Sequence, residues 1–244
     1  MHAAVALAAF FQTVTGVGFG MIAGPVILIL LNDPSAILVS TMMSWLIAVL
    51  LAPALVRGCD VAMLRRLGLG ALIGLPAGLA LLVLSDVAML KLLAGVTISV
   101  ATGLMMFGAP GIGRPGRGLD LAAGALGGLF GGALAMPGPT PAIRMGSLGY
   151  DKIALRSTMV TFFVVVWPVI LAGQVMTAGI AAPVAWYALS LVPATLVGLV
   201  IGQIATTRVS ELFFRRLVLA FLGATAFSLI ASFVADLSGI GLAP

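Results

Sequence analysis

The chain has 244 residues, of which 62% are hydrophobic and only 8% are charged. Because a soluble domain is about one quarter charged, this composition excludes an ordinary water-soluble protein and predicts a surface that mostly faces lipid. The formal net charge is +5, but the basic residues lie in short gaps between apolar runs. Such a pattern indicates membrane topology, and we expect no nucleic-acid partner.

In chain order, an interrupted apolar stretch at residues 3–32 comes first, and a second one covers residues 119–149. A single glycine or proline is compatible with helix packing or with a kink, but clusters of them predict broken helices. The clusters are Gly16, Gly18, Gly20 and Pro25 in the first stretch, and Gly127, Gly128, Gly131, Gly132, Pro137, Pro139 and Pro141 in the second.

The other apolar runs approach the roughly 20 residues that a helix needs to cross a bilayer. We predict six spanning helices, at residues 35–56, 67–84, 88–108, 157–176, 181–204 and 217–235. The N-terminal residues lack the basic region and the cleavage site of a signal peptide, so we expect them to remain in the mature protein.

The chain also contains an internal repeat. Ser40-Thr41-Met42 recurs as Ser157-Thr158-Met159, and Leu75-Pro76-Ala77 is echoed by Val192-Pro193-Ala194, in both cases 117 residues later. The equal offset predicts two related halves, which is common in transporters. We expect a first membrane repeat, a cytoplasmic linker and a second membrane repeat, at residues 1–110, 111–118 and 119–244.

The basic residues decide how the broken stretches enter the membrane. If both stretches crossed it, the two sides would hold seven and five basic residues. If each enters and leaves on one side, eleven fall on one side and only Lys91 on the other, as the positive-inside rule expects. We therefore predict an all-α integral membrane protein of two inverted repeats, each a re-entrant or broken helical hairpin plus three transmembrane helices, with both termini outside.

The hairpin tips are the candidate functional site. Backbone groups at a tip cannot be satisfied by lipid, so tips are buried in protein or line a polar cavity. The N-terminal ends of half-helices suit an anion. Hydroxyls near a tip either bond to a carbonyl one turn back or line the pathway. The candidate substrate-binding residues are Gln12, Thr13, Thr15, Gly16, Gly18, Gly20, Pro25, Ser40, Thr41, Ser44, Gly131, Gly132, Pro137, Pro139, Thr140, Arg144, Arg156, Ser157, Thr158 and Thr161.

The charged residues near the second tip have two interpretations. Arg144 and Arg156 are either topology anchors or anion-binding groups, because a guanidinium matches an oxyanion with two parallel donors. All seven acidic residues fall near the ends of segments, so the sequence shows no carboxylate relay at the bilayer centre. Coupling through substrate protonation, through sodium bound by carbonyls, or facilitated diffusion all stay open.

An enzymatic or metal site is not expected. The single histidine, His2, and the single cysteine, Cys59, lack the neighbours that a metal site needs. An intramembrane enzyme would need catalytic groups at depth, such as a Ser–His pair or paired aspartates, and the only histidine lies at the N-terminus. We expect neither enzymatic activity nor a cofactor.

The motifs around the two broken stretches resemble those of the TauE/SafE family of sulfite and organosulfonate exporters. The first runs from Gln12 through Gly16-Val17-Gly18-Phe19-Gly20 to Pro25, with Ala36 and Ser40-Thr41 after it; the second comprises Gly131-Gly132, Pro137-Gly138-Pro139 and Leu155-Arg156-Ser157-Thr158. The resemblance implies export of a small anion, often a sulfur oxyanion or a sulfonate, through the cell membrane. The family's run of three adjacent glycines is interrupted here by Phe19 and by Leu129-Phe130, so the resemblance leaves the substrate open.

We therefore expect a multi-pass cell-membrane transporter whose partners are a small anionic solute and the lipid bilayer. The sequence is also compatible with a homo-oligomer. Two alternatives remain: an anion channel, and a membrane scaffold subunit that transports nothing. The scaffold gives no reason to break two helices at matching places.

Overall fold

The computed structural model describes residues 1–107, 114–179, 182–206 and 222–234, and these are helical with short connections. Among them, five helices are long and apolar enough to cross a membrane. They are α3 (Ser35–Leu55), α4 (Val61–Leu84), α5 (Val87–Phe107), α8 (Lys152–Ala178) and α9 (Ala182–Ala205). The first five spanning helices expected from the sequence are thus confirmed. The sixth, at residues 217–235, lies partly outside the described residues. Its described part, Leu222–Val234, forms an apolar helix.

Both interrupted stretches are pairs of shorter helices, as expected. The first consists of α1 (His2–Thr15) and α2 (Phe19–Leu31), and the second of α6 (Arg117–Leu134) and α7 (Pro139–Ser147). Gly16 and Gly18 have φ values of 82° and 119°, which glycine adopts far more readily than other residues. The second break begins at Ala135, whose φ is 56°.

Each break between helices covers fewer residues than the cluster of glycine and proline that predicted it. Gly20 and Pro25 lie inside α2, and Gly127 to Gly132 lie inside α6. Glycines persist in α6 because they allow close contact with a neighbouring helix, as described below. Pro25 has no backbone N–H, so α2 loses one donor there, but the helix continues past it. Membrane helices tolerate such prolines.

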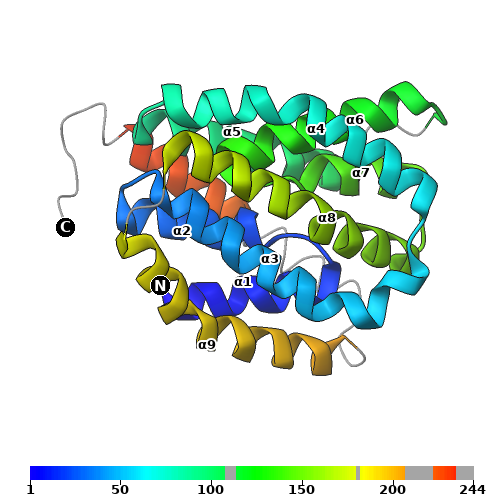
Figure 1. The fold of residues 1–244 in the computed structure, drawn as a ribbon, viewed down its shortest axis with the longest axis horizontal. Coiled ribbons are helices and arrows are strands. Elements are labelled where there is room, and N and C mark those ends of the chain that lie inside the picture. The colour runs from blue at the N-terminus through cyan, green and yellow to red at the C-terminus, as the bar shows by residue number, and fades with distance from the viewer. Residues whose placement is uncertain (108–113, 180–181, 207–221, 235–244) are drawn as a thin grey trace.

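The α6–α7 pair is an antiparallel hairpin. The Thr140 hydroxyl, near the start of α7, donates to the Ala123 carbonyl at 2.8 Å. The Arg144 Nε, farther along α7, donates to Asp120, which is earlier in α6, at 2.7 Å. Figure 1 shows that α1 and α2 likewise run in opposite directions, and that the two hairpins open toward opposite ends of the molecule.

Glycines bring the hairpins into close contact with the long helices. Gly70 and Gly74 of α4 lie against the carbonyls of Leu121 and Ala125 of α6, where any Cβ would overlap them. Gly124 and Gly128 of α6 lie equally close to the carbonyls of Leu67 and Ala71 of α4, and Gly132 has slightly more space. Such rows of small residues let membrane helices pack backbone to backbone. They fix α6, and with it the second hairpin, on α4.

Three pairs of helices make extensive contacts: α1 packs on α9, α6 packs on α4, and α3 packs on α8. Exposed side chains on the outer faces of the long helices are large and apolar, for example Ile73 on α4, Val165 on α8 and Val200 on α9, as expected for lipid-facing helices.

Candidate functional site at the hairpin tips

The two hairpin tips touch each other inside the protein. Gly20, in the first turn of α2, lies against the carbonyl of Ala135, and a Cβ at this position would overlap that carbonyl. Gly20 therefore sets how closely the breaks approach. The tip of the first hairpin is closed by Thr15, whose hydroxyl lies 2.8 Å from the Phe11 carbonyl and accepts from the Val17 N–H at 3.1 Å.

A narrow pocket lies between the tips, with an enclosed space of about 10 Å³, which is room for roughly one water molecule. A sulfur oxyanion is larger than one water molecule, so the tips would have to separate slightly to admit it. The breaks, α3 and α8 all contribute to it, and its lining consists of Gln12, Val17, Gly18, Phe19, Gly20, Met21, Ser44, Ala135, Met136, Pro137, Gly138, Pro139, Phe163 and Trp167. The lining contains no charged side chain.

Two polar groups of the pocket have no hydrogen-bond partner among the described residues. They are the Ser44 hydroxyl and the indole N–H of Trp167, and their residues are only 1% and 2% exposed. Buried polar groups are nearly always paired, so two unpaired donors beside one pocket indicate a ligand site. Gln12 also lines the pocket, but its amide donates to the Ser44 carbonyl at 3.1 Å and holds α1 against α3.

The backbone of the first tip adds further donors. The first hydrogen bond of α2 runs from the Ile22 N–H to the Gly18 carbonyl, so the N–H groups of Phe19, Gly20 and Met21 have no partner within the helix. All three residues line the pocket. The start of α7 differs, because its residues at positions 139 and 141 are prolines, which have no N–H. Donors are therefore concentrated at the start of α2.

Six of the residues predicted as substrate-binding line this pocket: Gln12, Gly18, Gly20, Ser44, Pro137 and Pro139. Four predicted hydroxyls instead bond to the carbonyl four residues earlier in their own helix. This is the common use of Ser and Thr in membrane helices, and it applies to Thr13, Ser40, Thr41 and Thr161. Among the remaining residues, Pro25 lies within α2, and the Gly131 and Gly132 carbonyls lie 3.4 and 3.1 Å from the amide nitrogen of Gln174.

Arg144 is paired with a buried carboxylate. Its Nε donates to Asp120 at 2.7 Å, and both residues are 1% exposed. The second Asp120 oxygen accepts from Arg66 of α4 at 2.5 Å. The Arg144 guanidinium also donates to the Arg114 carbonyl at 3.0 Å. This cluster ties α4, α6 and α7 together. Asp120 was not singled out from the sequence, because it stands 24 positions before its partner and only the hairpin brings the two together.

Arg156 lies beside the first tip. A Cβ at Gly16 would be 3.1 Å from both Cα and Cγ of Arg156, so the arginine covers the start of the break. Its Nε is buried and has no hydrogen-bond partner among the described residues. Arg156 does not line the pocket, but it is adjacent to the tip that does.

The Ser157-Thr158 pair holds the connection between α3 and α4. The Thr158 hydroxyl accepts from the Asp60 N–H at 2.9 Å, and Gly58 lies against the Ser157 side chain. The Asp60 carboxylate accepts from the Tyr150 hydroxyl at 2.5 Å. This hydrogen bond, and one from the Met63 N–H, lower the pKa of Asp60. Burial and the Asp60 contact raise the pKa of Tyr150 to about 12.

Trp167 and Phe163 were missed by sequence reasoning, which considered only polar residues and tip residues. A signal was available, since positions 156, 163 and 167 follow helical spacing and so share one face of α8. The two rings pack together with centroids 5.9 Å apart. Arg156 at one end of this face and Trp167 farther along it therefore lie on the side of α8 that meets the tips.

The comparisons with known proteins agree with this architecture. The family model described as "Sulfite exporter TauE/SafE" matches residues 1–229. No curated protein and no solved structure matches the chain significantly. With nearly the whole chain covered and five apolar helices of membrane length, the chain belongs to the TauE/SafE family of integral membrane transporters.

Proposed function

We propose that the protein moves a small sulfur oxyanion or sulfonate across the cell membrane, and that the solute binds in the pocket between the hairpin tips. The observation that carries this proposal is a pair of buried donors, Ser44 and Trp167, that have no hydrogen-bond partner in the described part of the chain and that line the pocket beside the start of α2. Free N–H groups and the positive end of the helix dipole favour an anion there.

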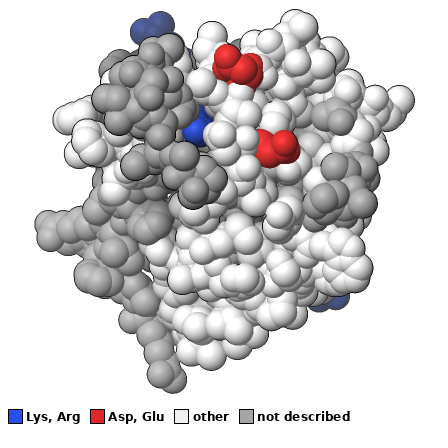
Figure 2. All heavy atoms as spheres, turned by 90° about the vertical axis from the view of Figure 1, so that its left-hand side faces the viewer, with Lys and Arg blue, Asp and Glu red and all other residues white. Residues whose placement is uncertain are grey.

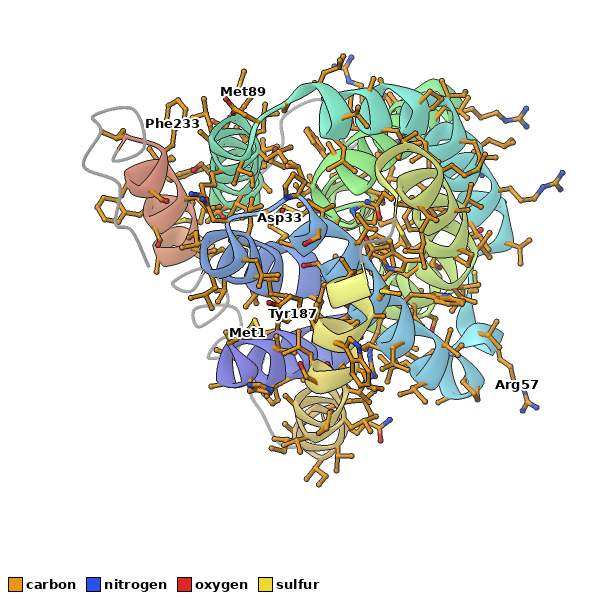
Figure 3. The ribbon with its side chains drawn as sticks, turned by 60° about the vertical axis from the view of Figure 1, so that its left-hand side comes forward. Met1, Asp33, Arg57, Met89, Tyr187 and Phe233 are labelled. Carbon is orange, nitrogen blue, oxygen red and sulfur yellow. The ribbon has the colours of Figure 1, made fainter. Side chains whose placement is uncertain are left out.

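The proposal includes inverted halves. Support comes from the exchanged helix pairs, α1 with α9 and α6 with α4, and from the hairpins that open toward opposite ends (Figure 1). The left-hand end of Figure 1, seen face-on in Figure 2, displays acidic side chains and few basic ones among its described residues. At the other end of α3 from Asp33, Arg57 points away from the helices (Figure 3). By the positive-inside rule the end with Arg57 faces the cytoplasm.

Membrane orientation can be tested with single cysteines in a Cys59→Ser background. Arg57→Cys should react with an impermeant thiol reagent only from the cytoplasmic side, and Met89→Cys only from outside. Labelling of both from the same side would rule out this arrangement.

Transport can be tested with purified protein in proteoliposomes. We expect saturable flux of labelled sulfite and methanesulfonate, with sodium flux no greater than in protein-free vesicles. Gly18→Leu should abolish this flux, because Gly18 lines the pocket. Gly149→Leu is the matched control, since Gly149 also combines a positive φ of 78° with open space around its Cα but does not line the pocket. Flux that does not saturate would favour a channel, and no flux of any anion would favour a scaffold.

A further inference from the structure

The pocket must neutralise an anion without a cationic side chain. Its lining offers the Ser44 hydroxyl, the Trp167 indole N–H and the start of α2, together with apolar walls that include Val17, Met136 and Phe163. A helix N-terminus is equivalent to roughly half an elementary charge. The nearest cation that the contacts identify is Arg156, which lies against Gly16 and outside the lining.

The two donors, the helix N-terminus and the neighbouring Arg156 together suit a solute with one negative charge. Desolvating an ion in a medium of low dielectric constant is costly, and in a continuum the cost rises with the square of the charge. Neutral donors and one neighbouring arginine can offset the cost for a monoanion but leave most of it uncompensated for a dianion. The apolar walls also suit a solute that carries an organic group next to its oxyanion.

Trp167 is well suited to this discrimination. An indole N–H is a donor only, so this group binds an acceptor oxygen and, unlike the face of the ring, does not bind a cation or the hydroxyl proton of an acid. Trp167 comes from α8 and Ser44 from α3, two helices that contact each other. Because both donors are buried and have no partner among the residues that the structure describes, a bound oxyanion would satisfy them.

We propose that Trp167 and Ser44 form the donor pair that holds the oxyanion, and that the pocket selects singly charged sulfonates or hydrogen sulfite over doubly charged oxyanions. This proposal rests on the proposed function and deepens it. It assigns Trp167 as a specificity-determining residue.

Methanesulfonate and sulfate provide the probe pair, because both are tetrahedral sulfur oxyanions and differ by a methyl group in place of one charged oxygen. Binding to purified protein in detergent is measured by calorimetry, and flux in proteoliposomes. We expect methanesulfonate to bind at least tenfold more tightly than sulfate. Trp167→Phe and Ser44→Ala should each weaken methanesulfonate binding about 10- to 100-fold, the range for a hydrogen bond to a charged group.

Trp45→Phe is the matched control. The Trp45 indole N–H is also buried without a partner, but Trp45 does not line the pocket. This variant should bind methanesulfonate like the wild type. If Trp167→Phe and Trp45→Phe lose the same affinity, or neither loses any, the assignment of Trp167 is wrong. If sulfate binds as tightly as methanesulfonate while both are transported, charge selection fails although the proposed function stands. If no anion is bound or transported, both proposals fail.

Discussion

Gly20 of α2 lies directly against the carbonyl of Ala135, which is the first residue of the second break. Two segments more than one hundred positions apart in the sequence therefore meet through a glycine without an intervening side chain. The pocket exists because the breaks cross at this point, so the geometry of the proposed site depends on one missing Cβ.

Gly20→Ala should push the tips apart. The added methyl group would overlap the Ala135 carbonyl, and such overpacking costs about 1–3 kcal/mol. We expect a lower melting temperature in detergent together with loss of anion flux. Gly68→Ala serves as the control: it has open space and should be neutral or stabilising by about 0.5–1 kcal/mol, since alanine favours helix over glycine. Wild-type stability of Gly20→Ala would contradict the close contact.

Arg144→Gln should lower the stability of the folded protein. Among the described residues, the substitution leaves the buried Asp120 with Arg66 as its remaining ionic partner, and removal of one partner from a buried ion pair costs about 3–5 kcal/mol. The double variant Asp120→Asn/Arg144→Gln should recover part of that stability, as measured by thermal unfolding in one detergent. A fully stable Arg144→Gln protein with impaired anion binding would instead place this arginine in the solute pathway.

Arg156 should behave differently, because it forms no pair with a carboxylate among the described residues. Its side chain lies beside the first tip, where a fixed positive charge raises the local anion concentration. We expect anion flux to decrease from wild type to Arg156→Lys to Arg156→Gln, with the full loss of interaction worth about 1–3 kcal/mol. Lysine keeps the charge but lacks the two-pronged donor geometry. Equal flux in wild type and Arg156→Gln, at matched protein incorporation, would reduce the residue to a topology anchor.

Tyr150→Phe should lower the melting temperature by removing the hydrogen bond to Asp60 in the connection between α3 and α4, and the size of this effect should depend on pH. The Tyr150 hydrogen bond lowers the pKa of Asp60, so its contribution to stability is present above the unfolded pKa of about 3.9 and is lost as pH falls through the folded value. Tyr150 keeps its proton at neutral pH because its pKa is about 12. The melting temperatures of wild type and Tyr150→Phe should therefore differ at pH 7 and converge in acid. A difference that is constant with pH would mean that the Asp60 contact is not its source.

Much of the fold follows from local patterns that a sequence displays directly. Apolar runs set the bounds of α3 and α5 within two residues, and clusters of glycine mark the break between α1 and α2. The start of α4 was placed too late, because Arg65 and Arg66 lie in its exposed first turns and interrupt the apolar pattern without ending the helix.

The site was less accessible to sequence reasoning, because it depends on contacts between distant segments. Ser44 and Gln12 could be found as polar residues near a tip. Trp167 was missed, since an aromatic residue inside an apolar span is usually a packing residue; its helical spacing from Arg156 places it on the same face of α8, and the fold brings that face to the pocket. The fold likewise brings together Asp120 and Arg144, whose pairing depends on the turn between α6 and α7.

The most direct test of the central claim is the reactivity of a cysteine placed in the apolar wall of the pocket, Val17→Cys in a Cys59→Ser background. Two methanethiosulfonate reagents of similar size are compared in proteoliposomes, one with a sulfonate group and one with a trimethylammonium group. If the solute is an anion that binds between the tips, the sulfonate reagent reacts faster and saturating methanesulfonate slows its reaction. Faster reaction of the cationic reagent, or no protection by methanesulfonate, sulfite or any other anion, would contradict an anion site in this pocket.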